Sequence, residues 1–196
     1  GISINKLTGS FRYGLGWNGT SSSYTQNDLG IIRQTNNQRF TMRLSYQLFE
    51  ETKILRSFNN YLFASQAYTY DNFIKKSWGF RQGNNFTFQN LMSLSLDFDY
   101  TSEYKDFDET RTVDRFIIEP ENFEIQLEIK SDNGKRFSYG FDVSNTNFFK
   151  QEFEENKSRT RVGLFADFRY SDRLSFGSGF QTINTIDDIG YLKKDM

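Results

Sequence analysis

The sequence contains no cysteine and no histidine. These absences exclude disulfide bonds, thiolate nucleophiles and every catalytic triad that uses histidine, and they remove the ligands of most zinc and iron sites. We therefore expect no cofactor, no metal site and no catalytic residues in this chain.

The sequence also lacks an excess of charge of either sign and any long apolar run. Its 24 Lys and Arg residues nearly balance 25 Asp and Glu residues, so the basic stripe that nucleic-acid binding requires is missing and nucleic acid is not an expected partner. No run approaches the roughly 18 apolar residues of a membrane-spanning helix, and no stretch has the 3.6-residue period of an amphipathic helix. A helical membrane protein is therefore excluded.

The apolar residues that are present are mostly large and aromatic. Hydrophobic residues make up 36% of the chain, yet it has 22 Phe and 11 Tyr residues. An aromatic share of 18% suits a lipid-facing wall with aromatic girdles at the two membrane interfaces.

Nine stretches of the chain alternate large apolar residues with small or polar residues. The clearest is 7–17, where Phe11, Tyr13 and Trp17 share one face and Arg12 and Gly14 belong to the other. Because the side chains of a strand point alternately to opposite sides, this period predicts a sheet with lipid on one side and water on the other. The predicted fold is all-β, an antiparallel up-and-down transmembrane β-barrel. The stretches are 7–17, 40–48, about 55–70 (whose facing is not assigned), 78–88, 94–100, 123–129, 137–143, 162–170 and 174–181.

The connections between these stretches alternate between long polar segments and short turns. The long segments are 19–37, 103–119 and 145–158, and the short turns are 50–53, 89–92, 132–135 and 171–172. Within the third turn, Asn133-Gly134 predicts a tight hairpin, because both residue types tolerate positive φ. Bacterial outer-membrane barrels have short turns in the periplasm and long loops outside. This rule places residue 1 in the periplasm and residue 196 outside the cell.

Nine strands cannot close a bacterial single-chain barrel, whose strand number is even. We therefore expect residues 1–196 to form a single segment of about nine strands from a larger barrel in the bacterial outer membrane, incomplete at both ends. The expected partners are membrane lipid, lipopolysaccharide and the remaining strands, from the same chain or a partner chain.

The same alternation assigns candidate residues to the two faces. The carboxylates among them could form a glycosidase pair, but mixed charges inside a barrel more often form an ion-pair network or a polar pore lining. The aromatic residues at the ends of the apolar rows could stack on sugars, but anchoring at the lipid headgroups is the more common role. The polar residues expected to face the lumen are Arg12, Arg43, Arg81, Asp97, Asp99, Glu124, Glu128, Arg136, Asp142, Arg161, Asp167 and Arg169. The residues expected to form the aromatic girdle are Trp17, Tyr46, Trp78, Tyr100, Tyr139 and Tyr170.

Two segments in predicted loops resemble each other. Residues 27–32 read Asn-Asp-Leu-Gly-Ile-Ile and residues 187–192 read Asp-Asp-Ile-Gly-Tyr-Leu. Asp28 with Gly30, and Asp188 with Gly190, could hold a divalent ion, since carboxylates beside a glycine turn suit calcium. The alternative is a turn capped by the Asp side chain, because neither copy has the spaced oxygen ligands of a calcium loop.

Together with Lys6-Leu7-Thr8-Gly9 and the Phe- and Tyr-rich hairpins, this recurrence resembles the C-terminal outer-membrane β-barrel of a Bacteroidota family of unknown function. The resemblance covers most of the chain. It implies a family-nine-type carbohydrate-binding module N-terminal to the barrel, so sugar binding is implied for that region alone, and it implies no catalytic residues.

The expected function is that of a porin-like barrel, not an enzyme, in a surface protein for glycan-related binding or transport. A structural barrel that is a component or client of an outer-membrane secretion or assembly complex is one alternative. A fragment of a large plugged transporter barrel is another.

Overall fold

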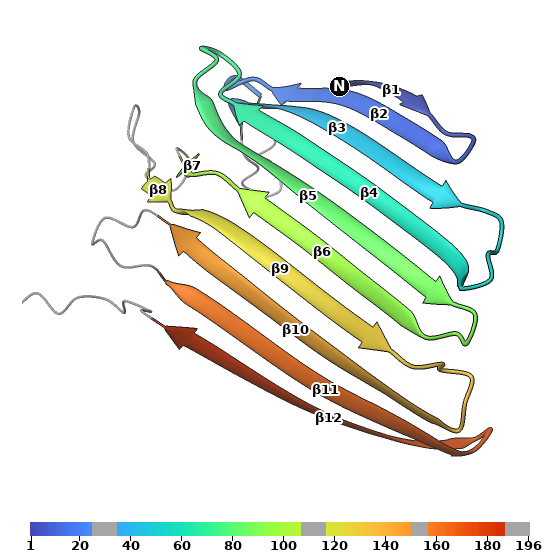
Figure 1. Ribbon diagram of the computed structural model, residues 1–196. Helices are drawn as coiled ribbons and strands as arrows, with labels where there is room; N and C mark the ends of the chain where they lie inside the picture. The colour runs from blue at the N-terminus through green and yellow to red at the C-terminus, as the bar shows by residue number, and fades with distance from the viewer. Residues whose placement is uncertain (25–34, 107–116, 150–156, 187–196) are drawn as a thin grey trace, which may run out of the picture.

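The computed structural model describes residues 1–24, 35–106, 117–149 and 157–186. Within these ranges there are twelve β-strands and no helix, so none that could cross a membrane. Ten of the strands form one sheet in which every neighbouring pair is antiparallel (Figure 1). This confirms the predicted all-β, up-and-down architecture. In sheet order the strands are β1 (Ile2–Lys6), β2 (Phe11–Thr20), β3 (Asn37–Leu48), β4 (Leu55–Tyr68), β5 (Lys75–Phe88), β6 (Ser93–Thr101), β9 (Glu121–Lys130), β10 (Phe137–Phe149), β11 (Ser158–Ser171) and β12 (Leu174–Ile186).

The sheet is open. Its edges are β1 and β12, and no pairing joins these two strands in the described residues. An open antiparallel sheet of this kind is compatible with a segment of a barrel. The number of strands in the sheet is ten and not the predicted nine.

The additional strand is β1, which pairs with β2 from Ile2 opposite Trp17 to Lys6 opposite Tyr13. The predicted start of the strand at residue 7 was wrong, because residues 7–10 form the turn between β1 and β2. Gly9 has a φ of 85° there, a left-handed conformation that glycine adopts without steric cost. Because of β1, residue 1 lies at the same end of the sheet as the long connection 21–36, and not at the short-turn end as predicted.

The predicted loop 103–119 contains two short strands, β7 (Tyr104–Asp106) and β8 (Ile117–Glu119), which pair with each other. They form a separate two-stranded sheet beyond the ends of β6 and β9 (Figure 1). The single proline, Pro120, lies between β8 and β9, where it takes no place in the central ladder.

The connections are sorted between the two ends of the sheet (Figure 1). One end, here called the loop end, carries the three long connections that the sequence predicts, and the other, the turn end, carries short turns. This sorting follows from antiparallel pairing of consecutive strands. The loop end holds connections 21–36, 69–74, 102–120 and 150–157, and the turn end holds 7–10, 49–54, 89–92, 131–136 and 172–173.

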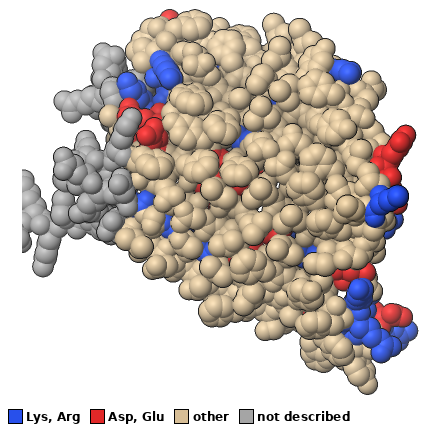
Figure 2. Space-filling view, viewed as in Figure 1, with Lys and Arg blue, Asp and Glu red and all other residues tan. Residues whose placement is uncertain are grey.

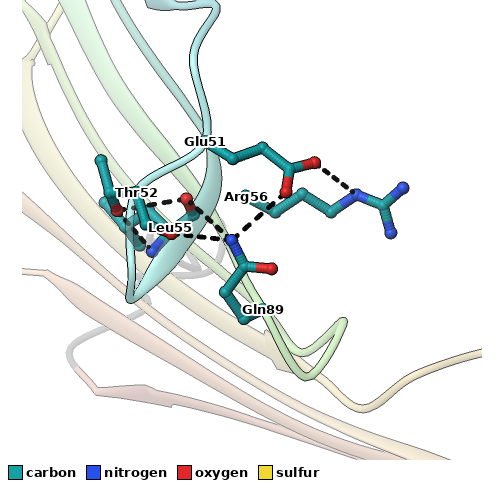
Figure 3. Close-up of polar contacts among 5 residues, drawn as sticks. All are labelled: Glu51, Thr52, Leu55, Arg56 and Gln89. Carbon is teal, nitrogen blue, oxygen red and sulfur yellow. Dashed lines mark hydrogen bonds and ion pairs between the residues drawn. The ribbon is translucent and has the colours of Figure 1, made fainter.

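The short turn between β3 and β4 is tied to the neighbouring turn by side-chain hydrogen bonds (Figure 3). Thr52 closes the turn, because its backbone N–H donates to the carbonyl of Leu55 at 2.8 Å and its Oγ1 accepts from the Leu55 N–H at 2.8 Å. Gln89, in the turn between β5 and β6, donates from Nε2 to the carbonyl of Thr52 at 2.8 Å. The carboxylate of Glu51 accepts a hydrogen bond from the Gln89 side-chain amide. The same carboxylate lies 3.5 Å from Arg56 Nε. These contacts fix the relative position of two successive hairpins.

The turn between β9 and β10 differs from the predicted tight Asn-Gly hairpin. It spans six residues, 131–136, and neither Asn133 nor Gly134 has a positive φ. The Asp132 carboxylate accepts the N–H of Gly134 at 2.7 Å, the arrangement of an Asx turn. A longer loop capped by an Asp side chain reverses the chain without left-handed residues, so the prediction was wrong about the turn type.

The two faces of the sheet differ in chemistry, and they are called here the apolar face and the polar face. Alternate residues of each strand point to the same face, and the cross-strand register aligns these residues across all ten strands. On the apolar face they form aromatic pairs between strands, such as Phe58 with Phe86 at 4.8 Å and Trp78 with Tyr100 at 4.9 Å between ring centroids. The large side chains of the apolar face include Ile2, Ile4, Tyr13, Leu15, Trp17, Phe40, Met42, Leu44, Tyr46, Phe58, Leu62, Trp78, Phe80, Phe86, Leu94, Leu96, Phe98, Tyr100, Phe123, Ile125, Leu127, Ile129, Tyr139, Phe141, Val143, Val162, Leu164, Phe168, Phe176 and Phe180.

No second layer of the described residues covers the apolar face. Ala67, at 4% exposure, is the one buried hydrophobic residue in the described part of the chain. Large apolar side chains on this face are exposed, among them Leu15 at 55% and Phe180 at 64% exposure. In Figure 2 charged atoms gather at the two ends of the strands, while uncharged atoms cover most of the middle. A sheet usually buries its hydrophobic face against another layer, and the described residues of this chain provide no such layer.

Candidate functional site

The polar face carries the candidate functional residues. The twelve polar residues that were expected to share a face do share one. Eleven of them lie on strands of the sheet. Arg136 immediately precedes β10, two residues before Ser138, whose side chain is on the polar face. Several of them lie directly opposite one another on successive strands. One row across β3, β4, β5, β6 and β9 consists of Arg43, Phe63, Arg81, Asp99 and Glu124.

The centre of the polar face is an ion-paired network. Arg81 donates from Nε to the carboxylate of Asp99 at 2.5 Å. The hydroxyl of Tyr61 donates to Asp97 Oδ1 at 2.7 Å. These side chains, with Glu124 and Gln126, line a cavity of about 260 Å³, here called the central pocket. The central pocket is acidic, because it is lined by three carboxylates and only one arginine.

A second set of ion pairs extends toward β11. Lys130 lies 2.7 Å from Glu128, and Arg161 Nε lies 3.5 Å from Asp142 Oδ2. The Asp142 carboxylate also occupies the space beside Gly163, where a Cβ would collide with it. A glycine in this position therefore lets the carboxylate lie flat against the neighbouring strand.

Arginine side chains on the polar face also cover aromatic rings. The guanidinium carbon of Arg43 lies 5.4 Å from the ring centroid of Phe63, and that of Arg12 lies 5.5 Å from that of Phe49. Such cation–π contacts contribute roughly 0.5–1 kcal/mol at exposed sites. They hold long cationic side chains over the sheet and away from its apolar face.

The turn end of the polar face has a second cavity, of about 330 Å³, between the strands β9 to β12. We call it the turn-end pocket. Unlike the central pocket, it is rich in cationic side chains and holds one carboxylate. It is lined by Lys130, Asn133, Lys135, Arg136, Ser138, Phe165, Asp167, Arg169 and Ser175.

The sequence did not identify Tyr61, Lys130 or Phe165 as site residues. Tyr61 belongs to the stretch whose facing could not be assigned, and Phe165 is an aromatic residue on the polar face. Both rings lie over a glycine of the neighbouring strand: a Cβ at Gly83 would collide with the Tyr61 ring, and one at Gly140 with the Phe165 ring. A glycine on one strand with an aromatic residue opposite it on the next is the signal that could have located them.

Five of the six predicted girdle residues belong to the apolar face, and the sixth, Tyr170, lies near the end of β11, where the register with β12 is irregular. Trp17, Trp78 and Tyr100 lie toward the loop end, and Tyr46, Tyr139 and Tyr170 toward the turn end. Two of them have polar partners: Trp17 Nε1 donates to Gln38 Oε1 at 3.2 Å, and the Tyr100 hydroxyl donates to Glu121 Oε2 at 3.0 Å. An apolar ring with a hydrogen-bonded polar atom suits a boundary between oil and water. The loop-motif residues Asp28, Gly30, Asp188 and Gly190 lie outside the described residues.

The carboxylates of the central pocket do not form an isolated acid–base pair. Asp99 is paired with Arg81, and Asp97 accepts the Tyr61 hydroxyl. Among the residues that the structure describes, no group of three or more His, Cys, Asp or Glu side chains is arranged to hold a metal ion. The absence of catalysis stays a prediction. Chemically, the polar face offers paired charges, amides and hydroxyls to a polar solute.

Fold and site together define a class of protein: an open, single-layer antiparallel sheet with one uncovered apolar face and one charged face. All 196 residues match a family described as a domain of unknown function, DUF5916, and the chain belongs to that family. No curated protein and no solved structure shows significant similarity to the chain.

Proposed function

We propose that this chain forms part of the wall of a bacterial outer-membrane β-barrel, with the apolar face toward lipid and the polar face toward an aqueous lumen. The observation that carries the proposal is the uncovered apolar face. Ten strands about 4.8 Å apart span about 43 Å across the sheet. Monomeric soluble proteins rarely expose a contiguous apolar patch larger than roughly 300–600 Å², so this face requires a large apolar partner.

The lengths of the strands support lipid as that partner. A tilted strand needs roughly 9–11 residues to cross a bilayer. Every strand of the sheet except β1 has between 9 and 14 residues. The aromatic residues of the apolar face at both ends of the strands, and the charged residues beyond them (Figure 2), match the two interfaces of a bilayer.

The open edges of the sheet support its being part of a larger barrel. In hydrocarbon an unpaired backbone N–H or C=O group costs several kcal/mol, so strands cross membranes as closed barrels. On this proposal β1 and β12 pair with further strands, from the same chain or from a partner.

A role in glycan-related binding or transport is the finer part of the proposal. The polar face supplies the hydroxyl, amide and charged groups that recognise saccharides, and two exposed cavities lie on it. The resemblance to a Bacteroidota barrel that follows a carbohydrate-binding module favours a glycan-related role for the protein that contains this chain, although it implies sugar binding for the module alone.

Membrane fractionation of cells that express the full-length protein tests the first part. We expect the protein in the outer-membrane fraction, resistant to extraction with alkaline carbonate and with a heat-modifiable mobility on gels. Recovery as a detergent-free, monomeric protein in the aqueous fraction would contradict the proposal. Calorimetric titration of the detergent-purified protein with neutral and acidic oligosaccharides tests the second part, which absence of binding to every saccharide would contradict.

A further inference from the structure

The turn-end pocket differs in charge from the rest of the polar face. Four cationic side chains, those of Lys130, Lys135, Arg136 and Arg169, line it together with one carboxylate, Asp167. The central pocket, on the same face, has three carboxylates and one arginine. The excess of positive charge is therefore a local property of this cavity and not of the face as a whole.

Part of this positive charge is not compensated inside the protein. Lys130 is paired with Glu128 at 2.7 Å, and Arg169 Nη2 donates to the carbonyl of Asn133 at 3.4 Å. Lys135 and Arg136 have no ion pair with any of the described residues. Cations gathered around one cavity repel each other, and an oxyanion within it relieves that repulsion.

The remaining lining suits a saccharide. The ring of Phe165 leans over Gly140, and Lys130 Nζ lies 6.0 Å from the ring centroid. The same cavity has the hydroxyl groups of Ser138 and Ser175. An aromatic ring with neighbouring hydroxyl groups can contact the apolar and polar sides of a sugar, while arginine binds carboxylate or sulfate with two parallel hydrogen bonds.

We propose that the turn-end pocket binds an acidic saccharide, with Lys135, Arg136 and Arg169 holding its carboxylate or sulfate group and Phe165 contacting the sugar ring. This inference rests on the proposed function, because it takes the polar face as the lining of a lumen that solutes reach. It adds the charge class of the solute and the place where the solute is bound.

Isothermal titration calorimetry of the full-length protein in detergent tests this proposal. The ligands are a trimer of galacturonic acid, a neutral galactose trimer and inorganic sulfate. We expect binding of the acidic trimer that weakens between low and about 0.5 M salt, because exposed charges are screened. We expect at least about tenfold weaker binding of the neutral trimer and of sulfate, since each lacks one set of contacts.

Two variants locate the site. Arg136→Gln with Arg169→Gln should weaken binding of the acidic trimer by about tenfold or more. Lys135→Gln with Arg136→Gln should weaken the binding by a similar factor. Because both substitutions are in the turn 131–136, this variant leaves β11 unchanged, so a folding defect in β11 cannot explain the loss. The matched control is Lys53→Gln with Arg56→Gln, which removes two positive charges at the turn end from another hairpin and should leave the affinity unchanged.

Three results would overturn the proposal: no binding of the acidic trimer, an equal loss in the control variant, or sulfate binding as tight as that of the trimer. The last result would assign the pocket to a free oxyanion and not to a saccharide. Carbonate-resistant recovery of the same protein from the outer membrane is measured separately. Absence of ligand binding by a protein that does insert into the outer membrane is therefore distinguishable from a failure of the proposed function.

Discussion

At the scale of single residues, Leu164 and Gln181 show how neighbouring positions acquire opposite environments. They lie on the adjacent strands β11 and β12, where Leu164 is opposite Phe180 and Gln181 is opposite Gly163. Their side chains therefore point to opposite faces of the sheet. If the sheet is part of a barrel wall, Leu164 contacts hydrocarbon and Gln181 contacts water.

Replacing Leu164 by Arg should reduce the free energy of unfolding of the membrane-inserted protein. Leu164 is in the middle of β11 and is 52% exposed on the apolar face, and an arginine near the bilayer midplane costs roughly 2–4 kcal/mol. Gln181→Arg places the same side chain on the polar face and should cost far less. Reversible urea unfolding in lipid vesicles measures both, and equal losses would show that the two faces are wrongly assigned.

The facing of most residues could be predicted from the sequence, because large apolar and polar side chains alternate cleanly in strands such as β9. It could not be predicted for β4. There Asn60 and Gln66 belong to the apolar face while Tyr61 and Phe63 belong to the polar face, so both parities mix apolar and polar residues. The position of Tyr61 depends on Gly83 of the neighbouring strand, and a cross-strand relation of this kind requires the register.

Gly140→Val should destabilise the protein by about 1–3 kcal/mol, the cost of overfilling a packed site. A Cβ at Gly140 would occupy the space of the Phe165 ring. Gly179→Val is the matched control, because a Cβ there would meet Leu164 O at 3.6 Å and Phe165 Cβ at 3.9 Å, which are ordinary contacts. The same unfolding assay compares them, and an equal cost at both glycines would contradict the packing of Phe165 on Gly140.

At the scale of elements, the connections were predicted better than the strand ends. The sorting of long and short connections follows from their lengths alone. β1 was missed because it has five residues, of which Ile2 and Ile4 are the two apolar ones, and because the alternation of the sequence continues through the turn 7–10. The β7–β8 hairpin was missed because a pair of three-residue strands gives no periodic signal.

Cysteine labelling tests which end of the sheet faces the outside of the cell. The chain has no native cysteine, so Ser22→Cys at the loop end and Lys53→Cys at the turn end each provide one reactive thiol. A bulky, membrane-impermeant maleimide should label Ser22→Cys in intact cells, and Lys53→Cys only after the outer membrane is disrupted. Equal labelling of both in intact cells would contradict the orientation, and labelling of Lys53→Cys alone would reverse it.

At the scale of the whole molecule, the two faces account for the fold. The sheet has no interior in the described residues, so its stability depends on what covers the apolar face. The sequence predicts that the twelve candidate polar residues share one face, and so most members of the charged networks. It misses Tyr61, which donates to Asp97, and Lys130, which pairs with Glu128. It does not predict the turn-end pocket, because that cavity gathers residues of one turn and four strands, and their proximity depends on register and on the six-residue turn 131–136.

The central claim is that the apolar face contacts lipid, and tryptophan quenching by brominated lipids tests it most directly. Both native tryptophans, Trp17 and Trp78, are replaced by Phe, and one new tryptophan is placed by Leu164→Trp or by Gln181→Trp in the full-length protein reconstituted in vesicles. Contact with lipid predicts strong quenching of the tryptophan at position 164, greatest for bromine deep in the acyl chains, and little quenching at position 181. Equal quenching at the two positions, or none at position 164, would contradict the claim.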